Sequence, residues 1–446
     1  MTFRDFLVTP IWIILILVMA WLMARRVTDR NTYIYFYPAL ILKILGALGV
    51  GLIYQFYYRG GDTFTYFRDG SYYLWKAFLD SPVKGLDLLF IKAGTVTTST
   101  YDYSSHIVFF GDPASYFIIR IAGVLDLFTF HTYSATAVLF AVFSFSGSWA
   151  FYTTFCRLYP RLHLPLAVAV FFIPSVFFWG SGLLKDSITL GALFWMTSGF
   201  IYVFIERRSP VLNLIVIFVS FYILYVVKIY ILLCFIPALL VWLYHHYISA
   251  VKNPVAKIMI LPFMLIVVGI TGYYAVKNIS SENSRYNLHT LTNTAEATAR
   301  WISYVSETEG GSTYSLGDYD YSVRGLVAKS HKAIWVTLFR PYFWESKNPV
   351  MILAAIESFI FLVFTLYALF RSGLIRFFRI LFTQPAVLFC MIFTLTFSFA
   401  VGITTYNFGS LVRYKIPMMP FYLIGLCLIL YYSNSPRKAR EPETVE

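Results

Sequence analysis

Long apolar stretches separated by short polar segments run through almost the whole chain. Each stretch has about the length that a helix needs to cross roughly 30 Å of hydrocarbon. They lie at about 8–24, 33–57, 133–156, 164–180, 187–205, 211–227, 229–247, 257–276, 349–370, 385–403 and 416–433. The pattern predicts an all-α, polytopic integral membrane protein with about eleven spans, in which residues 1–446 form a single transmembrane domain.

The segment 114–130 is more polar than its neighbours because it carries Arg120 and Asp126. We interpret it as an amphipathic helix that lies in the plane of the membrane interface, and a twelfth span is the alternative. With the in-plane placement, the basic loops between spans all fall on one side of the membrane. Short loops rich in Lys and Arg favour the cytoplasmic side, so we assign these loops to the cytoplasm. The in-plane placement therefore gives a consistent orientation.

This orientation places two long loops, 58–132 and 277–348, on the outer face and the tail 434–446 in the cytoplasm. The first outer loop contains the interfacial helix. Loops on a rigid scaffold commonly carry binding and catalytic residues. We therefore expect function on the outer face.

Composition supports the membrane class and excludes a nucleic-acid partner. Hydrophobic residues make up 59% of the 446 residues and charged residues only 13%, and the mean hydropathy is +0.69, which leaves too little polar surface for a soluble domain. The net charge of +13 comes from cations at the ends of apolar stretches, as membrane orientation requires. The four cysteines all lie in apolar stretches without metal-ligand or disulfide spacing.

The first polar motif, Gly60-Gly61-Asp62-Thr63, follows the second apolar stretch. Two glycines allow a sharp turn that would hold Asp62 at the membrane surface, where its carboxylate can take a proton from a hydroxyl group. Asp69 lies seven residues later and would share a helical face with Asp62. A solvated loop that begins with a glycine turn is the structural alternative.

The second motif is Gly180-Ser181-Gly182-Leu183-Leu184-Lys185-Asp186 between two spans. Charge at this depth is costly unless it is paired or faces water, so Lys185 is a candidate to neutralise a phosphate. Asp186 would instead pair with Lys185 and cap the next helix in the structural alternative. Lys228, between two closely spaced spans, adds an outer cation that snorkelling also explains.

The third and fourth motifs lie near the C-terminal spans. Arg340 and Glu345 belong to the aromatic stretch Phe339-Arg340-Pro341-Tyr342-Phe343-Trp344-Glu345, where the Arg340 fork suits a phosphate and the aromatic rings suit a sugar face or the membrane interface. Asn407 and Arg413 belong to Asn407-Phe408-Gly409-Ser410-Leu411-Val412-Arg413-Tyr414-Lys415. Cations at the outer end of the last span need an anionic partner, and a lipid phosphate is a natural one.

These motifs resemble those of GT-C-type polytopic membrane glycosyltransferases and of uncharacterised bacterial membrane proteins of that kind. Such enzymes use polyprenyl-phosphate or polyprenyl-diphosphate sugars. The resemblance implies that Asp62 is the catalytic base, with Asp69 supporting it or holding a divalent metal. It also implies that Lys185, Asp186, Lys228, Arg340, Glu345, Asn407 and Arg413 form the substrate and lipid-phosphate site.

The expected function is sugar transfer from a polyprenyl carrier to a glycan, lipid or protein acceptor at the periplasmic face of a bacterial inner membrane. A divalent metal held by Asp69 is the one cofactor that the resemblance suggests. A surface-polysaccharide polymerase or ligase needs similar arginines and depends less on Asp62. A transporter or flippase for lipid-linked saccharide is the alternative from another class; it would place charges near the bilayer midplane in broken helices.

Overall fold

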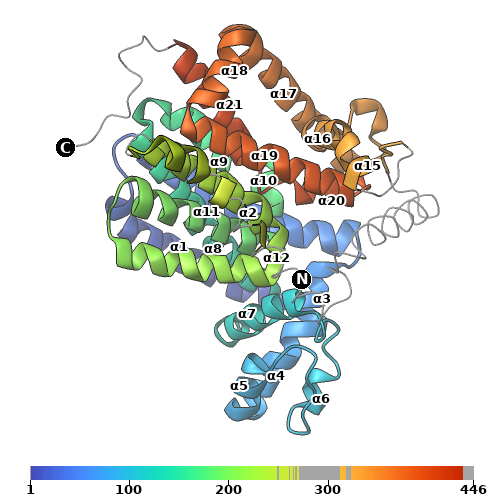
Figure 1. The fold of residues 1–446 in the computed structure, drawn as a ribbon. Coiled ribbons are helices and arrows are strands. Elements are labelled where there is room, and N and C mark those ends of the chain that lie inside the picture. The colour runs from blue at the N-terminus through green and yellow to red at the C-terminus, as the bar shows by residue number, and fades with distance from the viewer. Residues whose placement is uncertain are drawn as a thin grey trace. The chain divides into compact units, whose positions relative to one another are not determined.

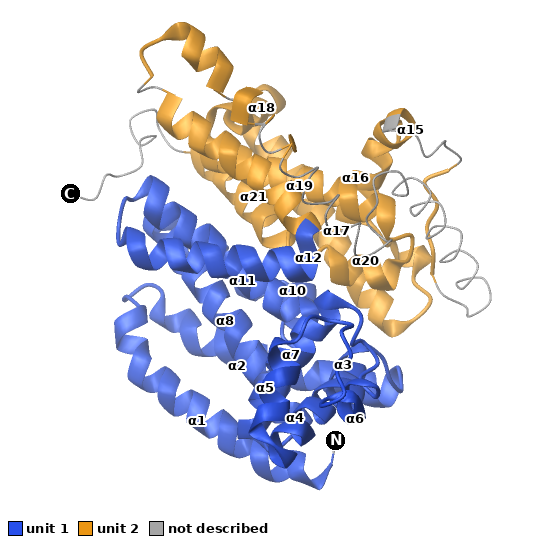
Figure 2. Cartoon of the chain, turned by 60° about the horizontal axis from the view of Figure 1, so that its bottom comes forward, with its two compact units in different colours: residues 1–229 blue, residues 230–446 orange. Residues whose placement is uncertain are grey.

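The computed structural model describes residues 2–248, 251–260, 262–264, 266, 269–270, 312–317 and 323–434. These residues are predominantly helical, and among them only Thr313 and Asn407 form a β-bridge. The chain divides into two compact units, residues 1–229 and 230–446 (Figure 2). Each unit is described by itself.

Seven helices are long and apolar enough to cross a membrane, and the bent pair at the C-terminal end makes an eighth if it counts as one span. This confirms the polytopic, all-α class over the described residues. Half of the predicted span 257–276 lies outside the described residues, as do the tail from residue 435 and large parts of the loop 277–348.

The first unit begins with two long helices, α1 and α2, and ends in the first half of α12 (Figure 1). Its helices are α1 (Phe3–Val27), α2 (Tyr33–Leu52), α3 (Asp62–Tyr66), α4 (Tyr72–Asp80), α5 (Pro82–Phe90), α6 (Tyr101–Ser104), α7 (Pro113–Thr129), α8 (Tyr133–Leu158), α9 (His163–Phe171), α10 (Pro174–Trp179), α11 (Lys185–Phe200) and α12 (Pro210–Tyr247). Helix α2 continues as a π-helical segment over Ile53–Tyr57, and α11 does so over Ile201–Ile205. Helix α8 is the centre of the unit, because α1, α2 and α11 all pack against it.

A pair of glycines explains how closely α8 and α11 approach. A Cβ atom built on Gly147 of α8 would lie 2.2 Å from the carbonyl oxygen of Gly191 on α11. Small residues at such a contact let two helix backbones pack directly, as is common between membrane helices. The glycine pair therefore sets the distance between these two helices.

Residues 58–132, which the sequence predicts as the first outer loop, are largely helical. Helices α4 and α5 pack as a hairpin, and α4 also packs against α7. The buried carboxylate of Asp126 on α7 holds this subdomain together, since it accepts hydrogen bonds from Ser71 Oγ and Thr136 Oγ1, both at 2.7 Å, and lies 2.9 Å from His131 Nδ1. The segment 114–130 is thus part of a helix, and the Asp126 carboxylate has hydrogen-bond partners within the protein.

Two parts of the chain differ from the predicted spans, one by breaking a span and the other by joining two spans in one helix. The stretch 164–180 forms the two short helices α9 and α10, because Ile173 precedes Pro174 and adopts an extended conformation. Helix α12 has 38 residues, and Lys228 inside it has non-helical angles of φ −148° and ψ 73°. This break falls between the expected spans 211–227 and 229–247.

The second unit consists of the second half of α12 and the helices that follow the outer loop. These are α15 (Val323–Ala328), α16 (Ser330–Phe339), α17 (Pro349–Ser372), α18 (Leu374–Thr383), α19 (Pro385–Thr404), α20 (Phe408–Tyr414) and α21 (Met419–Asn434). Helix α19 packs against α16, α18 and α21, and α17 packs against α21. Helices α20 and α21 meet at an angle of 64°.

Helix α16 lies within the residues expected as outer loop, yet it packs tightly along a spanning helix. Thr337 Oγ1 donates to the carbonyl oxygen of Ser398 at 2.9 Å, and a Cβ on Gly402 would lie 2.3 Å from the Ala333 carbonyl oxygen. The stretch that leads to Arg340 is therefore fixed against α19.

Candidate functional site

Two polar clusters, one in each unit, contain most of the residues singled out by the sequence. In the first unit, the cluster depends on how α2 packs against residues 177–182. Lys43 Nζ donates to the Gly180 carbonyl oxygen at 2.9 Å and to Ser144 Oγ at 3.0 Å. A Cβ on Gly46 would lie 2.7 Å from the Phe177 carbonyl oxygen. Helix α2 therefore clamps the turn that leads into α11.

The same helix ends at the glycine turn that carries Asp62. Arg59, Gly60 and Gly61 all have positive φ, at 55°, 148° and 117°. A Cβ on Gly61 would lie 2.7 Å from the Tyr54 ring, so this position needs a glycine for space as well as for backbone conformation. The turn ends the helical run of α2, and Asp62 begins α3 with a half-buried side chain.

Lys185 and Asp186 begin α11, but they do not pair with each other in the way that the structural alternative expected. Lys185 Nζ lies 3.2 Å from Asp112 Oδ2, and Asp186 forms a buried ion pair with Lys228. Asp62 and Lys228 are both close enough to act electrostatically on Lys185. The structure thus gathers Asp62, Lys185, Asp186 and Lys228 into one ionic cluster.

Asp112 is a member of this cluster that sequence reasoning missed. It is the N-cap of α7, where its Oδ2 accepts from the Ser115 backbone at 3.3 Å. Burial would raise the pKa of Asp112, but the hydrogen bonds from Ser115 and the charge of Lys185 outweigh burial and lower the pKa. The Asp-Pro sequence before a helix is the signal that could have identified it.

Asp69 lies apart from these contacts. It belongs to the π-helical turn Phe67–Ser71, and its side chain is exposed. Its backbone carbonyl oxygen accepts from Val108 N at 3.1 Å, and no ion pair of Asp69 occurs among the described residues. The expected supporting role of Asp69 stays a prediction.

In the second unit, residues 312–317 pair with the chain at the start of the fourth motif. Phe408 N donates to the Ser312 carbonyl oxygen at 3.0 Å, and Tyr314 N donates to the Tyr406 carbonyl oxygen at 3.1 Å. Asn407 is the N-cap of α20 and accepts from Ser410 N at 3.1 Å. Asn407 therefore has a structural partner in the described chain.

Arg340 lies among aromatic rings and forms a bidentate pair with Glu345. Its Nε donates to Glu345 Oε2 at 3.0 Å, and its Nη2 donates to Oε1. The guanidinium carbon is 5.2 Å from the Phe408 ring centre and 5.7 Å from that of Tyr342. Arg340 and Glu345 thus form an ion pair within the third motif.

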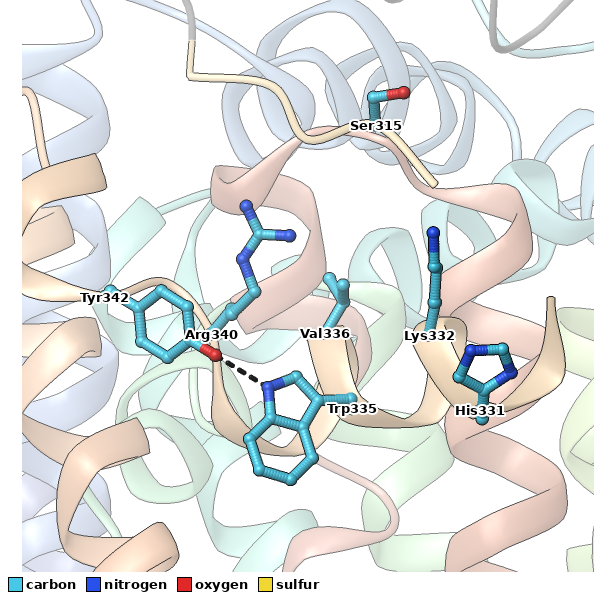
Figure 3. A pocket seen from close by; sticks show the side chains of 7 residues that line it. All are labelled: Ser315, His331, Lys332, Trp335, Val336, Arg340 and Tyr342. Carbon is cyan, nitrogen blue, oxygen red and sulfur yellow. Dashed lines mark hydrogen bonds between the residues drawn. The ribbon is translucent and has the colours of Figure 1, made fainter. Parts of the chain in front are cut away.

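A pocket of about 390 Å³ opens beside Arg340 and carries further cations. Figure 3 shows Lys332 and Arg340 extending from α16 and its end toward the segment that carries Ser315. His331, Trp335 and Tyr342 also line it, and Trp335 Nε1 donates to Tyr342 Oη at 2.6 Å. Three basic side chains and two aromatic rings thus share one pocket, without an acid among its lining residues.

Buried charges also lie within a helix that can span a membrane and at the bend between α20 and α21. Lys43 and Lys415 are each 1% exposed. Lys415 Nζ donates to Ser358 Oγ at 3.1 Å, and buried Glu357 acts on it electrostatically. Ser358 Oγ in turn donates to the Arg340 carbonyl oxygen at 3.0 Å. This chain of contacts joins the fourth motif to the third.

Arg413 is half-buried in the last turn of α20. The expected meeting of Asp62 with Arg340 and Arg413 is a relation between the two units, and it stays a prediction. Sequence reasoning missed Lys43, His331 and Lys332. A single lysine inside the apolar run Leu40–Ala47 could have identified Lys43.

Among the described residues, no group of three or more His, Cys, Asp or Glu side chains is arranged to hold a metal ion. The chain matches no protein-family model, no curated protein and no solved structure.

Proposed function

We propose that this chain is a membrane glycosyltransferase that moves a sugar from a polyprenyl-(di)phosphate carrier to a cell-envelope acceptor. The pocket of the second unit carries the proposal, because it combines Lys332, His331 and Arg340 with the rings of Trp335 and Tyr342. Basic side chains bind phosphate through charge-assisted hydrogen bonds, and aromatic rings stack on sugar faces.

Arg340 and Lys332 differ in how much of their positive charge is available to bind a phosphate. Glu345 occupies the Nε and Nη2 groups of Arg340 and partly neutralises it, so Arg340 acts as a cation held in a fixed position. Lys332 is exposed and reaches the pocket from the first turn of α16. A Cβ on Gly317 would lie 3.4 Å from Lys329 Nζ and 3.8 Å from Lys332 Nζ. Both lysines thus lie near Gly317, and Lys332 is the one that lines the pocket.

The transfer requires one bond to form and one to break. The acceptor hydroxyl oxygen bonds to the anomeric carbon of the sugar, and the bond from that carbon to the phosphate oxygen breaks. The electron pair leaves with the polyprenyl (di)phosphate, whose charge the basic residues stabilise. The hydroxyl proton passes to a carboxylate, which we assign to Asp62 on the resemblance described above.

Binding of polyprenyl monophosphate to the purified chain tests the phosphate site. Lys332→Ala should weaken binding about tenfold, which corresponds to about 1.4 kcal/mol for one charge-assisted contact. Arg379→Ala is the matched control, because Arg379 is an exposed cation of the same unit that does not line the pocket. Equal binding by wild type and Lys332→Ala would remove the phosphate site.

Asp62→Asn tests the transfer step separately. In cells, it should abolish the envelope glycan that depends on this chain while membrane insertion and polyprenyl-monophosphate binding remain. Normal glycan with Asp62→Asn would overturn its assignment as base. Loss of long glycan chains only, with single-sugar addition retained, would favour a polymerase or ligase.

One observation favours a transporter or flippase for lipid-linked saccharide as a second candidate. Lys43, Lys228 and Lys415 are buried within or at breaks of helices long enough to span a membrane. Ionisable residues and broken helices at that depth commonly mark transport paths. Movement of lipid-linked saccharide across proteoliposomes, without any change in its glycan, would decide for this candidate.

A further inference from the structure

A second pocket, of about 410 Å³, lies within the first unit and is not part of the ionic cluster. Helix α7 forms most of its wall, α5 contributes Phe90, and α12 contributes Tyr222. The rings of Phe117 and Tyr222 meet edge to face at 6.1 Å between their centres. Apart from Arg120 and the hydroxyl of Tyr222, the lining side chains are apolar hydrocarbon or aromatic groups.

Arg120 has an incomplete set of partners in this apolar surrounding. Its Nη2 donates to the Ile91 carbonyl oxygen at the end of α5, and its guanidinium carbon lies 4.4 Å from the Tyr116 ring centre. Its buried Nε has no hydrogen-bond partner, and no carboxylate forms an ion pair with it among the described residues. A cation beside apolar walls without an opposite charge is costly, and an anionic ligand would remove that cost.

The apolar surface continues from the pocket onto neighbouring helices. Phe90 is 78% exposed and Phe218 of α12 is 72% exposed. Helix α12 is among the helices apolar enough to lie in a membrane. Exposed apolar side chains on such a helix face lipid chains, so a hydrocarbon chain can extend from the pocket along Phe90 and Tyr222.

We infer that this pocket binds one anionic phospholipid, with the phosphate at Arg120 and an acyl chain between α5, α7 and α12. The bilayer supplies this ligand directly, and its phosphate supplies the charge that the pocket lacks. The inference is independent of the proposed transferase activity and of the cationic pocket in the second unit. Its tests therefore measure bound lipid and not sugar transfer.

The experiment uses the full chain in detergent, with native mass spectrometry to count bound lipid. After addition of phosphatidylglycerol or phosphatidylcholine at equal concentration, the wild type should retain phosphatidylglycerol at least tenfold better. Arg120→Gln should abolish that preference. Arg68→Gln is the matched control, because Arg68 is also in the first unit and its guanidinium carbon lies 4.5 Å from the Phe64 ring centre. It should bind phosphatidylglycerol as the wild type does.

Val124→Trp provides a test that leaves Arg120 in place. Val124 is half-buried and lines the pocket, so a tryptophan there should fill it and reduce phosphatidylglycerol binding at least tenfold. This variant decides the question if Arg120→Gln fails to fold. Unchanged binding in the folded variant, or equal retention of both lipids by the wild type, would overturn the inference. Displacement of phosphatidylglycerol by substoichiometric polyprenyl monophosphate would overturn the assignment to phospholipid.

Discussion

Lys185 Nζ lies 3.2 Å from Asp112 Oδ2, the same oxygen that accepts a hydrogen bond from the Ser115 backbone. One carboxylate oxygen thus joins the first turn of α11 to the first turn of α7. The pair is partly exposed, with 20% of the Lys185 side chain and 38% of the Asp112 side chain accessible. Solvent therefore screens it, and its contribution to stability is modest.

The lowered pKa of Asp112 fixes the pH at which this contribution disappears. It is fully present above the unfolded-state pKa of about 3.9 and is lost as the pH falls through the folded-state pKa. At pH 7, Asp112→Asn should lower the free energy of unfolding by about 1 kcal/mol or less. Thermal unfolding in detergent should show this difference shrinking below about pH 4.

Asp87→Asn serves as control for the Asp112 variant, because Asp87 is an exposed carboxylate of the same unit. It should change the unfolding temperature little at any pH. A wild-type advantage over Asp112→Asn that grew under acidic conditions would contradict the prediction.

Gly46→Ala should disturb the packing of α2 against residues 177–182. The added Cβ would lie 2.7 Å from the Phe177 carbonyl oxygen, which is a backbone atom. We expect a loss of about 1–3 kcal/mol in the free energy of unfolding. Gly49→Ala is the matched control, because its Cβ would meet only the movable ring of Phe178, at 3.1 Å. Similar stability losses in both variants would argue against a specific close contact at Gly46.

Lys228→Met should be strongly destabilising because it leaves the buried Asp186 carboxylate without its lysine. Breaking a buried ion pair on one side costs about 3–5 kcal/mol. Lys228→Met combined with Asp186→Asn should recover part of that loss, since no uncompensated charge then remains. Denaturant unfolding of the single and double variants measures the difference. A double variant less stable than either single variant would refute this account.

Lys43 and Ser144 should behave as a coupled pair. Lys43→Met removes the donor to Gly180 and to Ser144 Oγ, and we expect a loss of about 1–3 kcal/mol from the unpaired Gly180 carbonyl. Ser144→Ala removes one of these contacts. A double-mutant cycle should give a coupling energy of about 0.5–1.5 kcal/mol. Fully additive losses would show that the Lys43–Ser144 bond contributes nothing.

The spans were predictable where apolar length alone decides the structure. Helices α1, α8 and α17 match the expected stretches closely, because roughly 30 Å of hydrocarbon imposes a minimum apolar length. The breaks were harder to predict. Pro174 signals the interruption between α9 and α10, but hydropathy averaged over a window does not register it. A window average also hides single charges such as Lys43.

The candidate site was predictable in its residue types and less so in its pairings. Lys185 and Asp186 are adjacent in the sequence, and the structural alternative paired them with each other. In the structure each finds a partner on another element, Asp112 on α7 and Lys228 in α12. Consecutive residues on a helix point about 100° apart, so neighbours at its first turn face different surroundings. Such long-range pairings do not follow from local sequence.

The tight fit of α2 against the Gly180–Gly182 turn has a consequence for how this chain can vary. Asp62 follows the end of helix α2, and Lys185 follows the turn. The positions of both side chains therefore depend on the same contact. A methyl group added inside this buried contact, at Gly46 or Gly182, would shift the spacing of the two charges that follow the contact in sequence. Substitutions that change side-chain size in α2 should therefore alter the ionic cluster as readily as substitutions of the charged residues themselves.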